Sequence, residues 1–207
     1  PNLLANLHGD ASYNTLKLPL MFCIVPHIEY LDDKTTIGYL SERMVHEYRW
    51  LLSQILFSPI DLFFTEESFD TQYYYARFAL ETPDFHNFIS TFSSQILLFM
   101  KYIIENQELL IHDIETGEIS DKVDMSKKAR QYLQEHVSPN PQRASFLRKE
   151  FAKGTNEIFS RIWPSLSSIS TIGNGGFASY TRELRTYLSE KVKIFHYGYI
   201  ASEGIFA

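Results

Sequence analysis

The residues whose types and order most directly indicate chemistry lie near the C-terminal end. The run from Tyr199 to Gly204 places an aromatic ring, a hydroxyl, a carboxylate and a glycine directly after an apolar segment, residues 192–199, that we predict to be a strand. In a parallel α/β sheet such positions face the ligand. Glu203 is suited to binding Mg²⁺ through carboxylate oxygens, Ser202 to contacting a phosphate oxygen, and Tyr199 to stacking on a base. The alternative is a polar turn that only caps the strand.

A glycine loop precedes this run. Gly173, Gly175 and Ala178 satisfy G-x-G-x-x-A between a predicted strand and a predicted helix, and glycines there let a ligand approach the backbone. A dinucleotide fold expects an acidic residue about 20 residues further on, but the run from His196 to Tyr199 stands there. An NAD-dependent oxidoreductase is therefore disfavoured, and contact with a nucleotide of another kind is left open.

Several other classes of site are excluded because the sequence lacks the residues that they require. His46 and Glu47 lack the second histidine of H-E-x-x-H because Trp50 occupies that place. The chain has no G-x-S-x-G elbow and no G-x-x-x-x-G-K-[ST] loop, which argues against a serine hydrolase of that type and a P-loop NTPase. The single cysteine, Cys23, excludes an internal disulfide framework and a cysteine-rich zinc site. We interpret it as a small buried hydrophobe in a reducing, cytoplasmic compartment.

The composition and the charge argue against some classes of binding partner. Of 207 residues, 44% are hydrophobic and 21% charged, as in ordinary folded domains, and the net charge of -6 argues against a nucleic-acid partner. The apolar stretches are too short for a membrane-spanning helix, and no export signal is evident. The apolar run from Gly204 to Ala207 suggests a segment of a longer protein.

Periodicity predicts a mixed α/β fold with a large helical portion, in which the final strand, glycine loop, helix and strand form a unit with parallel strands. Gly117 predicts a turn, residues 120–130 an exposed loop or hairpin tip, and Pro139 with Pro141 a further break. The predicted strands are residues 16–25, 166–172 and 192–199, and the predicted helices are residues 41–58, 68–80, 85–110, 156–163 and 177–188.

Aromatic side chains are frequent on two of these predicted helices. Tyr73, Tyr74 and Tyr75 fall on one helix, and Phe88, Phe92 and Phe99 on the next. Aromatic residues at such spacing are most often core residues. The functional alternative is an apolar pocket between the two helices.

Together these motifs carry a family resemblance. The runs that carry it are Gln72–Leu80, Phe92–Glu105, Asp113–Ser120, Trp163–Pro164, Gly175–Gly176 and Tyr199–Gly204. In order and spacing they resemble the GH3 (auxin-responsive promoter) family of acyl acid–amido synthetases. The resemblance covers residues 59–207 and by extension the whole chain.

The resemblance implies an adenylate-forming (ANL-like) fold that uses ATP and Mg²⁺. A carboxylic acid would be activated by ATP, and its acyl group transferred to an amine or amino acid. By position, Gly175, Gly176 and Phe177 would line the adenine, with Tyr199 covering it and Ala201 beside the nucleotide. Ser202 would contact the α-phosphate and Glu203 would bind Mg²⁺, the two residues expected to be catalytic. Ile200 stands where many relatives have glycine.

The same resemblance implies an acyl-acid pocket between the helices that carry Tyr75 and Phe92–Gln95. The chain would then be an incomplete part of the large N-terminal domain: residues 16–155 form a mainly helical acyl-site region and residues 156–207 the nucleotide-binding half. The family's Ser/Thr/Gly-rich phosphate loop, its Tyr-Arg-x-Gly-Asp motif and its lid domain are not present in these 207 residues. We therefore expect the isolated chain to be inactive. The alternative is a non-catalytic GH3-like binding or interaction module.

Overall fold

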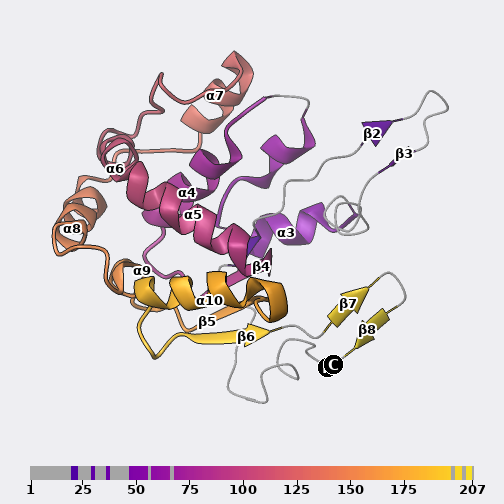
Figure 1. The fold of residues 1–207 in the computed structure, drawn as a ribbon. Helices are drawn as coiled ribbons and strands as arrows, with labels where there is room; N and C mark the ends of the chain where they lie inside the picture. Colours follow the sequence, from indigo (N-terminus) through magenta and orange to yellow (C-terminus); the bar gives the residue numbers. More distant parts are fainter. Residues whose placement is uncertain are drawn as a thin grey trace.

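The computed structural model describes residues 20–22, 29–30, 36–37, 47–55, 57–65, 68–196, 199–201 and 204–206. Helices form most of this part of the chain, and strands are short (Figure 1). In chain order the elements are β1 (Leu20–Phe22), β2 (Glu29–Tyr30), β3 (Thr36–Ile37), α3 (Arg49–Ile55), η2 (Ile60–Phe64), α4 (Thr71–Glu81), β4 (Asn87–Phe92), α5 (Ser93–Glu105), α6 (Gln107–Thr116), α7 (Lys127–Gln134), α8 (Pro141–Phe151), α9 (Ile158–Ile162), β5 (Ser168–Ile172), η3 (Gly175–Phe177), α10 (Ala178–Leu184), η4 (Arg185–Tyr187), β6 (Lys193–His196), β7 (Tyr199–Ala201) and β8 (Gly204–Phe206).

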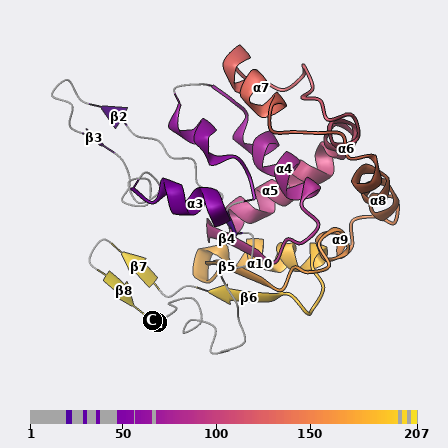
Figure 2. The ribbon, with the colours of Figure 1, turned by 180° about the vertical axis from the view of Figure 1, so that it is seen from behind.

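A parallel sheet with strand order β1-β4-β5-β6 organises the fold. Each crossover steps to the next strand in the same direction. The right-handed rule for such connections therefore places the connecting helices on one face of the sheet. Figures 1 and 2 show α5 and α10 on that face, where they pack against each other. The predicted mixed α/β class with a large helical portion is confirmed.

The helix predicted over residues 85–110 is wrong in its first part. Asn87–Phe92 forms β4, which pairs with β1 on one side and β5 on the other, and α5 begins only at Ser93. Phe88 and Phe92 therefore belong to a strand, and Phe99 to a helix. A short apolar run buried between two parallel strands cannot be distinguished from a buried helix by its periodicity alone.

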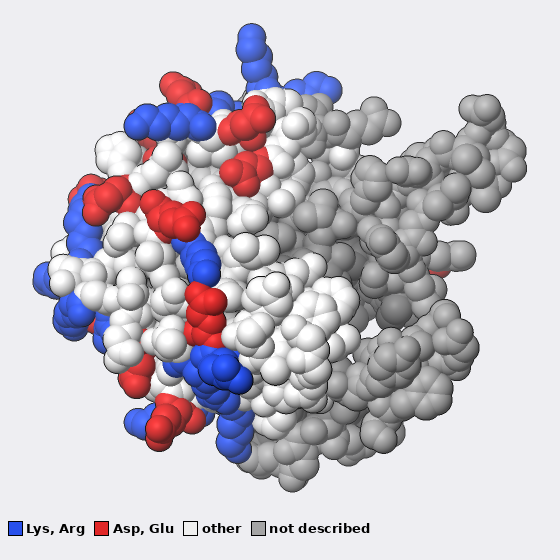
Figure 3. Space-filling model, in the orientation of Figure 1, with Lys and Arg blue, Asp and Glu red and all other residues white. Residues whose placement is uncertain are grey.

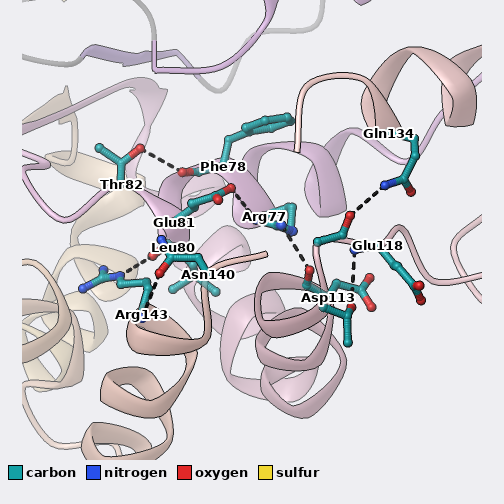
Figure 4. A network of polar contacts seen from close by, with 12 residues as sticks. Arg77, Phe78, Leu80, Glu81, Thr82, Asp113, Glu118, Gln134, Asn140 and Arg143 are labelled. Carbon is teal, nitrogen blue, oxygen red and sulfur yellow. Dashed lines mark hydrogen bonds and ion pairs between the residues drawn. The ribbon is translucent and has the colours of Figure 1, made fainter. Parts of the chain in front are cut away.

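The break predicted at Pro139 and Pro141 is the start of a helix. The Asn140 side chain accepts a hydrogen bond from Arg143 N (3.1 Å), and Pro141 occupies the first turn, where its missing N–H costs nothing. The buried Arg143 then donates from Nε to the Leu80 carbonyl (2.6 Å) and from Nη2 to the Ile162 carbonyl (2.9 Å). One guanidinium therefore satisfies carbonyls at the C-terminal turns of α4 and α9. Figure 4 shows the bond to Leu80.

The helix predicted over residues 68–80 is confirmed as α4, whose N-cap Asp70 accepts a hydrogen bond from Tyr73 N. Its residues 73–80 are all buried, so the three consecutive tyrosines are core residues. The fully buried Arg77 donates from Nη1 to Glu81 Oε2 (2.6 Å) and from Nη2 to the Asp113 carbonyl (3.1 Å), as Figure 4 shows. These bonds offset part of the cost of burying the charge, while Arg77 Nε has no hydrogen-bond partner in the described part of the chain.

The segment predicted as an exposed loop or hairpin tip is partly ordered by one side chain. Gly117 ends α6 in the left-handed conformation (φ 71°), which confirms the predicted turn. Arg130 then donates to the carbonyls of Ile119, Ser120 and Val123 at 2.8–2.9 Å. The loop folds around this guanidinium and is followed by α7, so only part of the segment is exposed.

The strand predicted over residues 192–199 is shorter than expected. It ends at His196, and a separate antiparallel pair follows, in which Tyr199 lies opposite Phe206 and Ala201 opposite Gly204. Ser202 and Glu203, which connect these strands in sequence, lie outside the described residues, as do Cys23 and His46. Within the described helices, no stretch combines the length and apolar character needed to cross a membrane.

Candidate functional site

The carboxyl ends of three parallel strands define the candidate site. Phe92, at the end of β4, lies opposite Ile172 at the end of β5, and Thr171 lies opposite His196 at the end of β6. The chain turns from strand to helix directly after β4 and, through η3, soon after β5. In open parallel α/β sheets, ligands bind at this edge.

An aromatic contact joins the two strand-to-helix turns. The rings of Phe92 and Phe177 are stacked, with centroids 4.8 Å apart and planes inclined by 20°. The Ser93 hydroxyl also donates to the Phe177 carbonyl over 3.3 Å. The sequence predicts different subsites for Phe177 and Phe92, and the structure brings the two rings into direct contact.

Gln95 supports the turn after β4. Its Oε1 accepts hydrogen bonds from Ser90 Oγ (2.8 Å) and from the Phe92 backbone N–H (3.2 Å). The backbone donor fixes which end of the amide is the oxygen. In the described part of the chain, no hydrogen bond uses Gln95 Nε2.

The glycine loop presents exposed backbone beside this turn. An added Cβ at Gly175, which has φ +57°, or at Gly176 would meet no atom within 4 Å. The main chain is therefore open to close approach, which fits the nucleotide contact expected there. Gly173 differs: an added Cβ would lie 2.4 Å from Thr181 Oγ1 and 2.6 Å from His196 Cε1, so this glycine serves packing.

Tyr75 lies in an aromatic cluster with η2. Its ring stacks on Phe63 (5.5 Å, 29°) and meets the edge of Tyr74 (5.3 Å), and only 8% of its surface is exposed. Its assignment to the acyl pocket stays a prediction. For Tyr199 and Ala201 the structure describes backbone pairing in β7 alone, and Ser202 and Glu203 lie outside the described residues.

Charged groups of both signs are mixed on the described surface that Figure 3 shows. Lys and Arg side chains alternate with Asp and Glu side chains on the face in Figure 3, and Lys101 pairs with Glu183 between α5 and α10 (2.6 Å). The histidine, cysteine and carboxylate side chains that the structure describes form no cluster suited to a metal ion.

Two residues at the edge were missed by sequence reasoning, Thr181 and His196, and Ser93 was expected only as part of the run Phe92–Gln95. Thr181 Oγ1 donates to the Gly173 carbonyl (2.9 Å), tying α10 to the loop that precedes it. The available signal was position, because Ser93 directly follows β4 and His196 ends β6. Only the strand order β4-β5-β6 shows that these positions lie at the same edge of the sheet.

Comparison with known proteins identifies the family. The chain matches the GH3 family N-terminal domain over residues 8–194. It belongs to the GH3 family. Its fold is that of "GH3.15 acyl acid amido synthetase", a solved structure with TM-score 0.78 and 21% sequence identity over 97% of this chain. A second GH3.15 structure, "in complex with 2,4-DB", matches with a TM-score of 0.74 and 18% sequence identity over 94% of this chain. The fold expected from the GH3 resemblance is confirmed.

Curated relatives in the GH3 family are plant amido synthetases. The chain is 30% identical over 99 residues (47% of its length) to "Indole-3-acetic acid-amido synthetase GH3.8" of Oryza sativa subsp. indica. It is 28% identical over 212 aligned residues (90% of its length) to the GH3.15 enzyme of Arabidopsis thaliana. The matches cover 16% and 35% of these relatives, and 36% of the GH3.15 structure, so the chain spans about a third or less of each.

Proposed function

We propose that this GH3 chain provides the acyl pocket and part of the nucleotide site of an ATP-dependent acyl acid–amido synthetase. The observation that carries the proposal is the contact between Phe92 and Phe177 at the carboxyl edge of the sheet. It brings a residue expected in the acyl pocket against one from the glycine loop. Such proximity is what carboxylate activation requires, because the acid must meet the α-phosphate of the nucleotide.

The nucleotide side would be formed by the glycine loop and the C-terminal run. Gly175 and Gly176 would allow the base to approach the backbone, as their open surroundings permit. Tyr199 would cover the base, with Ala201 beside it. Ser202 would donate to the α-phosphate, and Glu203 would bind the Mg²⁺ that neutralises phosphate charge. ATP, when bound, would supply the adenylyl group that activates the acid.

The acyl side would be formed by the turn after β4. Phe92 would supply an apolar wall. Gln95 would offer the N–H groups of Nε2 to an oxygen of the acid, since its Oε1 is already held by Ser90 and the Phe92 backbone. Tyr75 would bound the pocket from α4. The chain would thus divide into the acyl region of residues 16–155 and the nucleotide half of residues 156–207.

The second candidate function is a non-catalytic binding module of the same fold. The observation in its favour is that these 207 residues contain neither the phosphate loop nor the Tyr-Arg-x-Gly-Asp motif. Such a module would bind an acid or a nucleotide without forming an adenylate.

The test is acid-dependent exchange of pyrophosphate into ATP, measured on the protein as its source cells produce it. Glu203→Ala should lower Mg²⁺-dependent exchange about 100-fold, because one charge-stabilising group is lost. Glu190→Ala is the matched control, since it removes an exposed carboxylate outside the site and should leave exchange unchanged. Unchanged exchange in Glu203→Ala would refute that assignment. No exchange in the wild-type protein, with binding retained, would favour the non-catalytic module.

A further inference from the structure

Phe177 belongs to the glycine loop in sequence, but its ring points to the neighbouring turn. The ring lies face to face with Phe92, 4.8 Å away, while Tyr180 lies 6.2 Å away and inclined by 41°. Both rings of the stacked pair are partly buried. The face of Phe177 toward Phe92 is therefore covered by protein, and a base could stack there only if the two rings separated.

The backbone of Phe177 holds the ring in this position. Its carbonyl accepts a hydrogen bond from Ser93 Oγ (3.3 Å) and lies 3.4 Å from Thr181 Oγ1, whose single proton has its nearer acceptor in the Gly173 carbonyl (2.9 Å). Ser93 is the first residue of α5, and Thr181 lies in α10. The ring is thus anchored to the β4–α5 turn, where Gln95 Oε1 is held by Ser90 Oγ and the Phe92 backbone N–H.

We propose that Phe177 is a specificity-determining residue of the acyl pocket and not a contact of the adenine. The inference rests on the proposed function and deepens it. Within the glycine loop, the backbone of Gly175 and Gly176 serves the nucleotide, and the ring of Phe177 extends the apolar wall that Phe92 begins. Together the two rings limit the width of the acid that the pocket accepts.

The consequence is a separation of kinetic effects between the two substrates. Shortening a side chain that lines an apolar pocket changes discrimination between acids of different width by about tenfold or more. A residue of the acyl wall should therefore change KM for the acid and leave KM for ATP within about twofold. A residue that lines the adenine should do the reverse.

The experiment uses the protein as its source cells produce it, with benzoic, naphthoic and indole-acetic acids as probes of increasing width. Phe177→Ala and the larger Phe177→Leu are compared with Leu98→Ala, which shortens a side chain that is 60% exposed on α5. We expect both Phe177 variants to shift the preference among the acids by about tenfold or more toward the widest. The Leu98 variant should match the wild type. Phe92→Leu should shift preference in the same direction.

Other results would overturn the inference. A rise in KM for ATP with unchanged acid preference in Phe177→Leu would place the ring at the adenine. Equal changes in KM for the acid and in KM for ATP, or no change in either, would show that Phe177 is a packing residue only. Absence of acid-dependent exchange in the wild-type protein would refute the proposed function itself, a result distinct from altered selectivity in an active enzyme.

Discussion

The hydroxyl of Tyr73 donates a hydrogen bond to Asp113 Oδ2 over 2.6 Å, linking α4 to α6 inside the core. Both side chains are essentially unexposed. Burial raises the pKa of Tyr73 far above its ordinary value, and the bond to Asp113 raises it further. The same carboxylate oxygen accepts from Ser120 N (2.9 Å), so this pair also anchors the loop after Gly117.

Tyr73→Phe should lower the free energy of unfolding by about 1–3 kcal/mol, because a buried carboxylate loses a donor. Asp113 is poorly placed to absorb this loss, since its Oδ1 has no hydrogen-bond partner in the described part of the chain. Urea unfolding provides the measurement. Tyr180→Phe, at a tyrosine that is 41% exposed, is the control and should stay within about 0.5 kcal/mol of the wild type. Equal stability of the two variants would contradict the role assigned to the bond.

Two glycines of one loop should respond differently to alanine. Gly173→Ala would place a methyl group 2.4 Å from Thr181 Oγ1 and 2.6 Å from His196 Cε1, and should cost about 1–3 kcal/mol of stability. Gly176→Ala meets nothing within 4 Å and should be nearly neutral. Thermal unfolding of both variants checks the difference. A large loss at Gly176, or none at Gly173, would contradict the packing described here.

Glu150 should give a pH-dependent contribution to stability. A hydrogen bond from Lys153 (2.5 Å) lowers the pKa of this carboxyl, with Arg161 (3.2 Å) adding to the effect and burial opposing it. Because the folded-state pKa lies below the ordinary value of 4.5, the contribution is complete above pH 4.5 and disappears as the pH falls through the folded-state pKa.

The check is Glu150→Gln against wild type in urea unfolding from pH 7 to pH 3. We expect a difference of about 1 kcal/mol that is constant above pH 5 and shrinks below pH 4.5. Glu190→Gln, at an exposed position, serves as the control and should show no such pattern. A gap between Glu150→Gln and wild type that widens toward acid would contradict the sign.

The isolated 207-residue chain should form no amide from ATP, Mg²⁺, a carboxylic acid and an amino acid. It contains no phosphate loop to position the triphosphate. Mass spectrometry of the products is the measurement, with the protein made by the source cells as the reference. Amide formation by the purified chain would show that the loop is dispensable.

Local signals were sufficient for the elements that have clear boundaries. The helix over residues 68–80, observed as α4, and the β-branched run of β5 followed by the glycine loop were predicted within a few residues. The signals failed where one pattern has two physical meanings. The run from Phe88 to Phe92 fits a helical period but lies between two strands, and Asn140 with Pro141 starts a helix instead of interrupting one.

The sequence was sufficient to predict which residues belong to the site, but not which of them contact one another. Phe92 and Phe177 were both expected to contact a substrate. Phe92 was expected at the acyl acid and Phe177 at the nucleotide, yet their rings touch. Their contact follows from the pairing of β4 with β5, which depends on long-range contacts that periodicity does not encode. The occupation of Gln95 Oε1 by Ser90 and Phe92 was likewise invisible, because it depends on β4 being a strand.

The pairing of β4 with β5 also has a consequence during synthesis. Asn87 and Ser168, which face each other across these strands, are 81 residues apart in the chain. At about 5–20 residues per second, the ribosome would take roughly 4–16 seconds to add the intervening segment. The β5-facing edge of β4 is without its partner for that time, while α5, α6 and α8 can already form local contacts. This makes the nascent chain most vulnerable to aggregation before Ile172 has left the ribosome.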